Sequence, residues 1–110
     1  MKSNCRTILV NSAQTAGHEV ISDTANDIVM VIKDGWPCRW NPIDCSETAF
    51  QLMADACLTV EITDNDCEAW KIVGDRRIWQ SEPFGNHHGN KFAATRMAIV
   101  RLAAELQEVE

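Results

Sequence analysis

The sequence has few basic residues and no long apolar run. Its 10 lysines and arginines stand against 16 acidic residues, which gives a formal net charge of −6. Binding to nucleic acid requires clustered Lys and Arg at the phosphates. The pair Arg76 and Arg77 and the pair Arg96 and Arg101 come nearest to such a cluster. No apolar stretch approaches the roughly 20 residues that cross a bilayer. We therefore expect neither a nucleic acid nor a membrane as a partner.

Cysteines in ligand-like pairs are also missing. The five cysteines stand at positions 5, 38, 45, 57 and 67, an odd number without the spacing of a disulfide framework. Structural zinc requires thiolates in pairs such as C-x₂-C, whereas Cys38 and Cys45 are separated by a proline-containing stretch. The first residues do not form an apolar signal segment. Together these features predict a reduced cytoplasmic protein with no metal site and no cofactor.

The hydrophobic pattern predicts a single domain over residues 1–110. Short turns at 23–26 and 74–75 indicate hairpins, and hairpins favour an antiparallel sheet. The expected fold is α+β, with helices packed on an antiparallel sheet in the order α-β-β-α-β-β-β-α. The predicted helices cover 5–16, a segment that begins after Asp44, and 91–107; the predicted strands cover 18–22, 27–33, 58–63, 67–73 and 76–81.

Two of these strands carry a clear burial signal. The strand at 27–33 is apolar on both faces, so it should lie centrally or be covered on both sides. The strand at 58–63 alternates, which places Leu58, Val60 and Ile62 together on the face toward the core.

The first helix has signals at both ends. Ser3 or Asn4 is a candidate N-cap, and Gly17 stands where a left-handed residue ends a helix. The apolar face consists of Cys5, Ile8, Leu9, Ala13 and Ala16. A strand through residues 8–10 is the alternative.

The middle of the chain contains Pro37 and Pro42, and each proline biases the preceding residue away from the helical conformation. We expect residues 34–42 to be an extended crossing loop without regular structure. A helix then begins with Asp44 as N-cap and Glu47 as its capping-box partner. Its predicted buried stripe is Ala49, Leu52, Met53 and Ala56, widened by Phe50.

The last helix is apolar around most of its circumference. Asn90 is its candidate N-cap, and Arg101 and Glu105 are spaced for an ion pair. One core-facing stripe does not require so many apolar positions, so we expect a second buried surface and hence a homodimer. The apolar positions are Phe92, Ala93, Ala94, Met97, Ala98, Ile99, Val100, Leu102, Ala103 and Leu106.

Several stretches together resemble a known group of proteins. They are Ala-Gly at 16–17, Trp-Asn-Pro-Ile-Asp at 40–44, Thr-Ala-Phe-Gln-Leu at 48–52 and the Ala-rich stretch 93–104. This pattern resembles a family of small phage and prophage proteins of unknown function with an α-β-α sandwich domain. The resemblance implies a phage-borne accessory protein in the host cytoplasm, and it supplies no catalytic residues.

The loop at 82–89 contains the most chemically active side chains. His87 and His88 precede a helix N-terminus, where free N–H groups favour an anion. With Asn90 and Lys91 they form a candidate ligand site; the alternative is a solvated loop tip. No Ser, Cys or carboxylate is placed by the sequence to assist the histidines in acid–base catalysis, so we expect no enzyme activity.

The sequence contains four tryptophans and no tyrosine. Trp36 and Trp79 have polar or proline neighbours and should be partly exposed, although any one Trp is more often part of the core. Exposed Trp and Arg are frequent hot spots of protein interfaces. The candidate interface residues are Trp36, Trp40, Trp79, Arg96, Met97, Val100 and Arg101.

The sequence therefore predicts a non-enzymatic accessory protein that acts by contact with an unidentified host or phage protein. The alternative is a module that binds a small ligand or nucleotide and so inhibits host defence.

Overall fold

A computed structural model of the chain describes residues 2–23 and 28–109. Its fold is α+β, as predicted, with one strand more than expected. The elements are α1 (Lys2–Thr15), β1 (Glu19–Asp23), β2 (Ile28–Lys33), β3 (Trp36–Arg39), α2 (Ser46–Asp55), β4 (Thr59–Ile62), β5 (Asp66–Val73), β6 (Arg76–Pro83), the 3₁₀ helix η1 (Phe84–His87) and α3 (Lys91–Val109). Beyond Asp23, the turn predicted at 23–26 lies outside the described residues.

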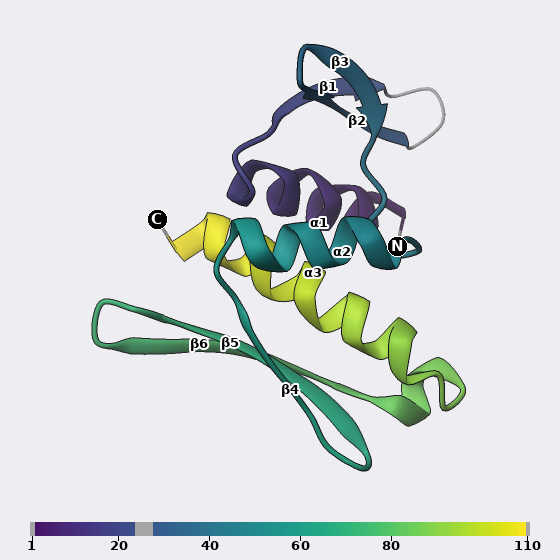
Figure 1. Ribbon diagram of the computed structural model, residues 1–110, viewed down its shortest axis with the longest axis vertical. Helices are drawn as coiled ribbons and strands as arrows, with labels where there is room; N and C mark the ends of the chain where they lie inside the picture. The colour runs from purple at the N-terminus through teal and green to yellow at the C-terminus, as the bar shows by residue number, and fades with distance from the viewer. Residues whose placement is uncertain (1, 24–27, 110) are drawn as a thin grey trace.

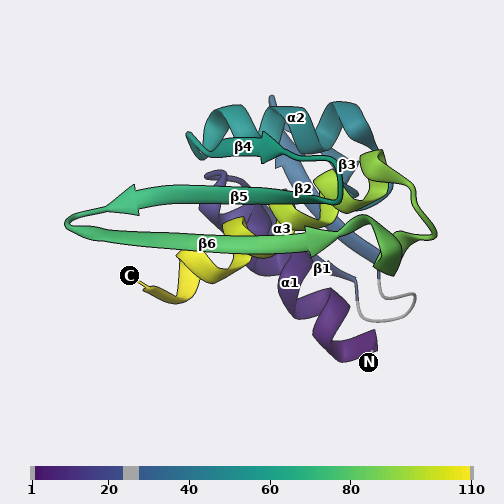
Figure 2. The ribbon, with the colours of Figure 1, turned by 90° about the horizontal axis from the view of Figure 1, so that it is seen from below.

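The strands form two antiparallel sheets rather than one. The first has the order β1-β2-β3 and the second β4-β5-β6. Figure 1 shows the first sheet above α1 and α2, with α3 below these helices and the second sheet below α3; Figure 2 shows the second sheet from below. The helices therefore lie between two sheets, whereas the family resemblance implies a sheet between helices. None of the described helices combines the length and the apolar character of a membrane-spanning helix.

The first sheet confirms the central position of β2 and corrects the predicted loop at 34–42. Val29 and Val31 of β2 are buried, while β3 pairs with β2 after a two-residue turn. Both turn residues, Asp34 and Gly35, have positive φ angles (53° and 82°), as an Asp-Gly hairpin turn requires. Pro37 is accommodated because β3 is an edge strand, where a missing N–H costs no ladder hydrogen bond.

Helix α1 ends as predicted but begins earlier. Gly17 has φ 88° and its N–H bonds the carbonyl of Gln14, while the His18 N–H bonds the carbonyl of Ala13. These bonds satisfy carbonyls at the helix end. Ser3 and Asn4 lie inside the helix, so neither is the N-cap, and the strand through 8–10 is excluded. The predicted contribution of the Cys5 side chain lies outside the described residues.

Helix α2 begins later than the sequence suggested. Cys45 occupies the N-cap position with extended angles (φ −117°, ψ 114°), and no side chain caps the helix. Asp44 falls within the turn that follows Pro42, which the Cys45 N–H closes by bonding the carbonyl of Asn41 at 3.0 Å. The capping box with Glu47 is therefore wrong. Of the predicted stripe, Ala49, Leu52 and Ala56 are buried and Met53 is half-buried, but Phe50 is exposed.

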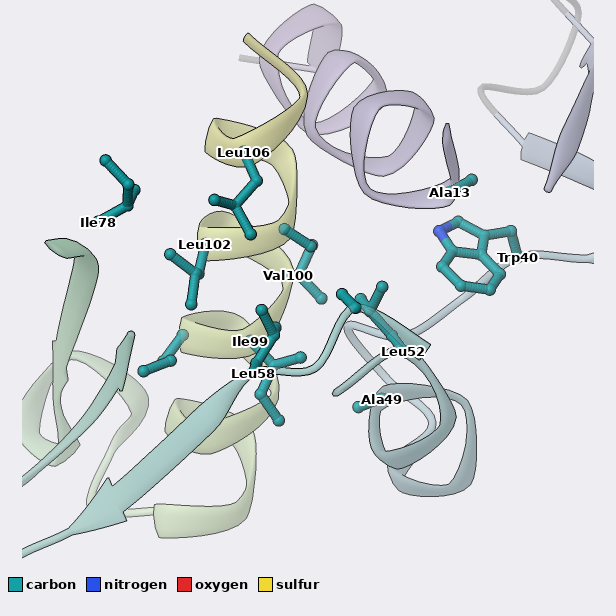
Figure 3. Close-up of a cluster of buried hydrophobic side chains, with 14 of the residues drawn as sticks. Ala13, Trp40, Ala49, Leu52, Leu58, Ile78, Ile99, Val100, Leu102 and Leu106 are labelled. Carbon is teal, nitrogen blue, oxygen red and sulfur yellow. The ribbon is translucent and has the colours of Figure 1, made fainter. Parts of the chain in front are cut away.

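Helix α3 is the centre of the core, and from Ala98 to Leu106 its apolar side chains are covered by its own chain, whereas Phe92 at its start is exposed. It packs against α1 and α2 on one side and against β5 and β6 on the other. In Figure 3, Leu102 extends toward the side of Ile78 in β6, and Val100 toward the side of Leu52 in α2. The expected second buried surface is thus supplied within one subunit, which removes the argument for a homodimer. The predicted pair of Arg101 with Glu105 is also wrong: Arg101 faces Glu82, and Glu105 accepts a hydrogen bond from Gln80.

Candidate functional site

The tryptophans divide into two exposed and two more covered residues. Trp36 and Trp79 are exposed by 74% and 51%, which confirms the predicted exposure. Trp40 is buried, and its Nε1 donates to Ser12 Oγ at 3.1 Å while its ring contacts that of His18 edge-on at 5.0 Å. Trp40 therefore anchors the chain between β3 and α2 and is not available to a partner.

The interface residues predicted on α3 do not form one exposed surface. Val100 is fully buried and Met97 is half-buried. Arg96 donates from Nε to the Ile43 carbonyl (2.7 Å) and from Nη1 to Ser46 Oγ (2.9 Å), so it ties α3 to the start of α2. The exposed tryptophans are also separated, because Trp36 belongs to the first sheet and Trp79 to the second, on opposite sides of the helices (Figure 1).

Most of the predicted loop at 82–89 has regular structure, because residues 82–83 belong to β6 and residues 84–87 to η1, and His87 has a carboxylate partner. His87 lies in η1, and its Nε2 is 2.7 Å from Oε1 of the buried Glu82. Arg101 Nε lies 3.5 Å from the other oxygen of Glu82. Glu82 is the last residue but one of β6 and lies on the same face as Ile78 and Gln80. This period-2 pattern is the signal in the sequence that places the Glu82 side chain on the inner face.

The other residues of the candidate ligand site, which are Asn90, His88 and Lys91, do not join the contact between His87 and Glu82. Asn90 Oδ1 accepts hydrogen bonds from the N–H groups of Phe92 and Ala93, both at 3.0 Å, which confirms it as the N-cap of α3. Two of the N–H donors that an anion would use are therefore already bonded. His88 is exposed in a left-handed conformation (φ 56°), while Lys91 lines a groove to which neither histidine contributes.

That groove lies between α2, β4 and the N-terminal half of α3. Its volume is about 390 Å³, within the range of roughly 300–1,000 Å³ that is common for binding clefts. Figure 1 shows β4 leaving the C-terminal end of α2 and diverging from it, with α3 between the two. The lining is predominantly apolar and includes Phe50 and Met53 from α2, Val60 and Ile62 from β4, and Phe92 and Ile99 from α3.

Three large apolar side chains of this groove are exposed to solvent. Phe50 is 63%, Ile62 is 55% and Phe92 is 69% exposed. They come from three different elements and meet at one groove. Two cations, Lys91 and Arg96, also line it, although the whole chain has a net charge of −6. We call this surface, defined by Phe50, Ile62 and Phe92 with Lys91 and Arg96, the α2–β4 groove.

The outer face of the second sheet carries a different cluster. Trp70 and Trp79 stand directly opposite each other on β5 and β6. The Arg77 guanidinium lies 5.0 Å from the centre of the Trp70 ring and 2.6 Å from Glu68 Oε1. These side chains pack against one another on the surface of the sheet, and none of them lines the α2–β4 groove.

The thiols differ in their surroundings. Hydrogen bonding to Thr48 lowers the pKa of the partly exposed Cys45 thiol, whereas burial raises the pKa of Cys67. Within residues 2–23 and 28–109, no three His, Cys, Asp or Glu side chains gather as a metal-ligand set. The chain matches no protein-family model, no curated protein and no solved structure.

Proposed function

We propose that this protein is not an enzyme and acts by binding a segment of another protein in the α2–β4 groove. One observation carries the proposal: Phe50, Ile62 and Phe92, each more than half exposed, converge on one groove. Large apolar side chains exposed singly are common, but several gathered at one hollow are typical of interaction sites.

The shape of the groove favours a protein segment over an enclosed small ligand. Its three large apolar side chains remain exposed at the rim, so an occupant would itself stay partly in contact with solvent. A nucleotide requires donors for its phosphates, and the Asn90 side chain already bonds two of the N–H groups at the start of α3. The small-ligand alternative at residues 85–91 is therefore the less supported of the two.

The cellular context that we propose is a phage or prophage accessory protein in the host cytoplasm, with a host or phage protein as partner. The Trp-Asn-Pro turn and the Ala-rich last helix support it. In the structure Trp40, Pro42 and Val100 of these motifs are buried. The resemblance thus concerns residues of the core. It does not indicate which protein binds in the groove.

Selection from a displayed library of random peptides tests the proposal. We expect enriched peptides to bind the wild-type chain and a Trp36→Ser/Trp79→Ser control, but not a Phe50→Ser/Phe92→Ser variant. The control removes two exposed aromatic side chains that lie outside the groove. Equal binding to the groove variant, in chains shown to be folded by circular dichroism, would exclude the groove as the binding surface.

A thermal-shift screen tests the small-ligand alternative. A nucleotide at 100 times its Kd would stabilise the chain by about 2.7 kcal/mol. We expect no such shift with wild-type protein. A shift that is lost in a His88→Ala/Lys91→Ala variant would instead support a ligand site at residues 85–91.

A further inference from the structure

We infer that the occupant of the α2–β4 groove is an extended peptide that pairs with β4 as a fourth strand of the second sheet. The peptide carries two apolar side chains at alternate positions and a carboxylate close to them. This inference rests on the proposed function and specifies the mode of binding and the chemistry of the partner.

The first argument is the free edge of β4. Within the described ranges, no strand pairs with β4 on the side away from β5. The Thr63 N–H bonds the Asp66 carbonyl at 2.9 Å, so Thr63 faces β5. Antiparallel ladders alternate, so Ile62 and Val60 direct their backbone N–H and C=O groups away from β5. Leu58, two residues before Val60, also directs its N–H away from β5. This N–H bonds the Met53 carbonyl of α2 at 2.9 Å.

This free edge borders the groove. Figure 2 shows α2 along the side of β4 that is opposite β5, and residues of both elements line the same hollow. β4 and α2 are joined at the Leu58 end and diverge toward Ile62 (Figure 1). An added strand would thus enter at the open end, beside Phe50 and Phe92, and its main chain would meet Val60 and Ile62.

The side chains of β4 indicate which positions of the bound peptide should be apolar. Val60 and Ile62 are opposite Ala69 and Cys67, which are both fully buried, so they project from the α3 side of the sheet. Side chains on that face of a neighbouring strand recur at every second residue. Two apolar side chains at positions i and i+2 of the peptide would therefore enter the groove together.

The charges at the groove indicate an acidic group on the partner. Arg96 uses Nε and Nη1 to hold Ile43 and Ser46, which keeps its charge at the groove wall. Among the described residues, the Lys91 ammonium has no hydrogen-bond partner. A carboxylate beside the apolar side chains would meet both cations on a chain that is otherwise acidic.

A second copy of the chain fits this edge poorly in the register that places Val60 opposite Ile62. If two β4 strands paired antiparallel so that Val60 met Ile62 of the other copy, the two Glu61 side chains would stand directly opposite each other. Like charges in that position destabilise a pair of strands. A foreign strand with its own sequence avoids this repulsion.

Backbone N-methylation of a selected peptide tests the strand pairing. We expect methylation at every second residue to weaken binding by about tenfold or more, since it removes hydrogen bonds to β4. Methylation at the intervening residues should have little effect. Binding without this alternation would overturn the strand pairing while leaving the proposed function intact. Failure to select any peptide would instead count against the proposed function itself.

Amide hydrogen exchange provides an independent readout on the protein. The peptide should slow exchange at Val60 and Ile62, while Thr63, already bonded to Asp66, should change little. Replacing the acidic residue of the peptide with Asn should weaken binding to wild type by a larger factor than binding to Lys91→Gln, in which only Arg96 remains to meet the carboxylate. If light scattering gives twice 12.3 kDa without peptide, and Val60 and Ile62 are already protected, the occupant is a second copy and the inference is wrong.

Discussion

The indole Nε1 of Trp40 donates a hydrogen bond to Ser12 Oγ at 3.1 Å, and both residues are buried. Ser12 Oγ in turn donates to the Leu9 carbonyl at 2.9 Å. A helix residue and a loop residue 28 positions apart are thus joined by a polar contact inside the core. The contact fixes the chain between β3 and α2 against α1.

Ser12→Ala should destabilise the fold, because it leaves the buried Trp40 N–H without an acceptor. An unsatisfied buried donor costs about 1–3 kcal/mol, which urea unfolding monitored by tryptophan fluorescence or circular dichroism measures. Trp40→Phe removes the donor N–H itself, so no unsatisfied group remains when Ser12 is also replaced. In the Trp40→Phe background, Ser12→Ala should therefore cost clearly less, and equal costs in both backgrounds would show that the hydrogen bond does not stabilise the fold.

Truncation of two side chains of α2 should change the free energy of unfolding by very different amounts. Leu52 is fully buried, so Leu52→Ala should cost about 2–5 kcal/mol through lost contacts and a cavity. Phe50 is 63% exposed, and Phe50→Ala should change the free energy of unfolding by no more than about 0.5 kcal/mol. Urea unfolding of both variants checks this. A large cost for Phe50→Ala would place that side chain in the core and remove it from the groove.

Local patterns predicted most of the fold. The β-branched run of β2 indicated a central strand, Gly17 marked the end of α1, and Asn90 marked the start of α3. These signals involve residues close together in the chain. β3 differs from the predicted loop because Asp34 and Gly35 form a hairpin turn and because an edge strand tolerates Pro37.

The α2–β4 groove could not be predicted in the same way. Phe50, Ile62 and Phe92 are apolar residues in periodic patterns, and such residues are assigned to the core by default. Their exposure depends on the divergence of β4 from α2 and on the position of α3 between them (Figure 1). The contact of His87 with Glu82 is local in the chain, but it depends on the 3₁₀ helix η1, which is not predicted from the sequence.

The cap of α3 provides a third prediction. Asn90→Ala should cost about 0.5–2 kcal/mol because the N–H groups of Phe92 and Ala93 lose their acceptor. Asn90→Asp keeps an acceptor oxygen and should retain most of the stability. Thermal and urea unfolding of the two variants measure the difference. If the Ala and Asp variants were equally destabilised, the loss would not come from the cap.

The two cysteines with shifted pKa values should differ in their reaction with iodoacetamide. Hydrogen bonding to Thr48 lowers the pKa of Cys45, so its thiolate is populated at lower pH than that of an ordinary cysteine. The pKa of Cys67 is raised by burial, and the side chain is inaccessible, so both factors slow its reaction. Peptide mass spectrometry over a pH series should show Cys45 alkylated first, with a midpoint below the usual range for thiols.

A Thr48→Val variant identifies the cause of this reactivity. Removing the Thr48 hydroxyl should move the midpoint of Cys45 alkylation to higher pH, because the side-chain hydrogen bond is the largest influence that lowers its pKa. Cys67 should react only when the chain unfolds, so its rate should follow urea concentration in both proteins. An unchanged Cys45 midpoint in Thr48→Val would show that the thiolate is stabilised by the backbone at the start of α2 and not by the hydroxyl.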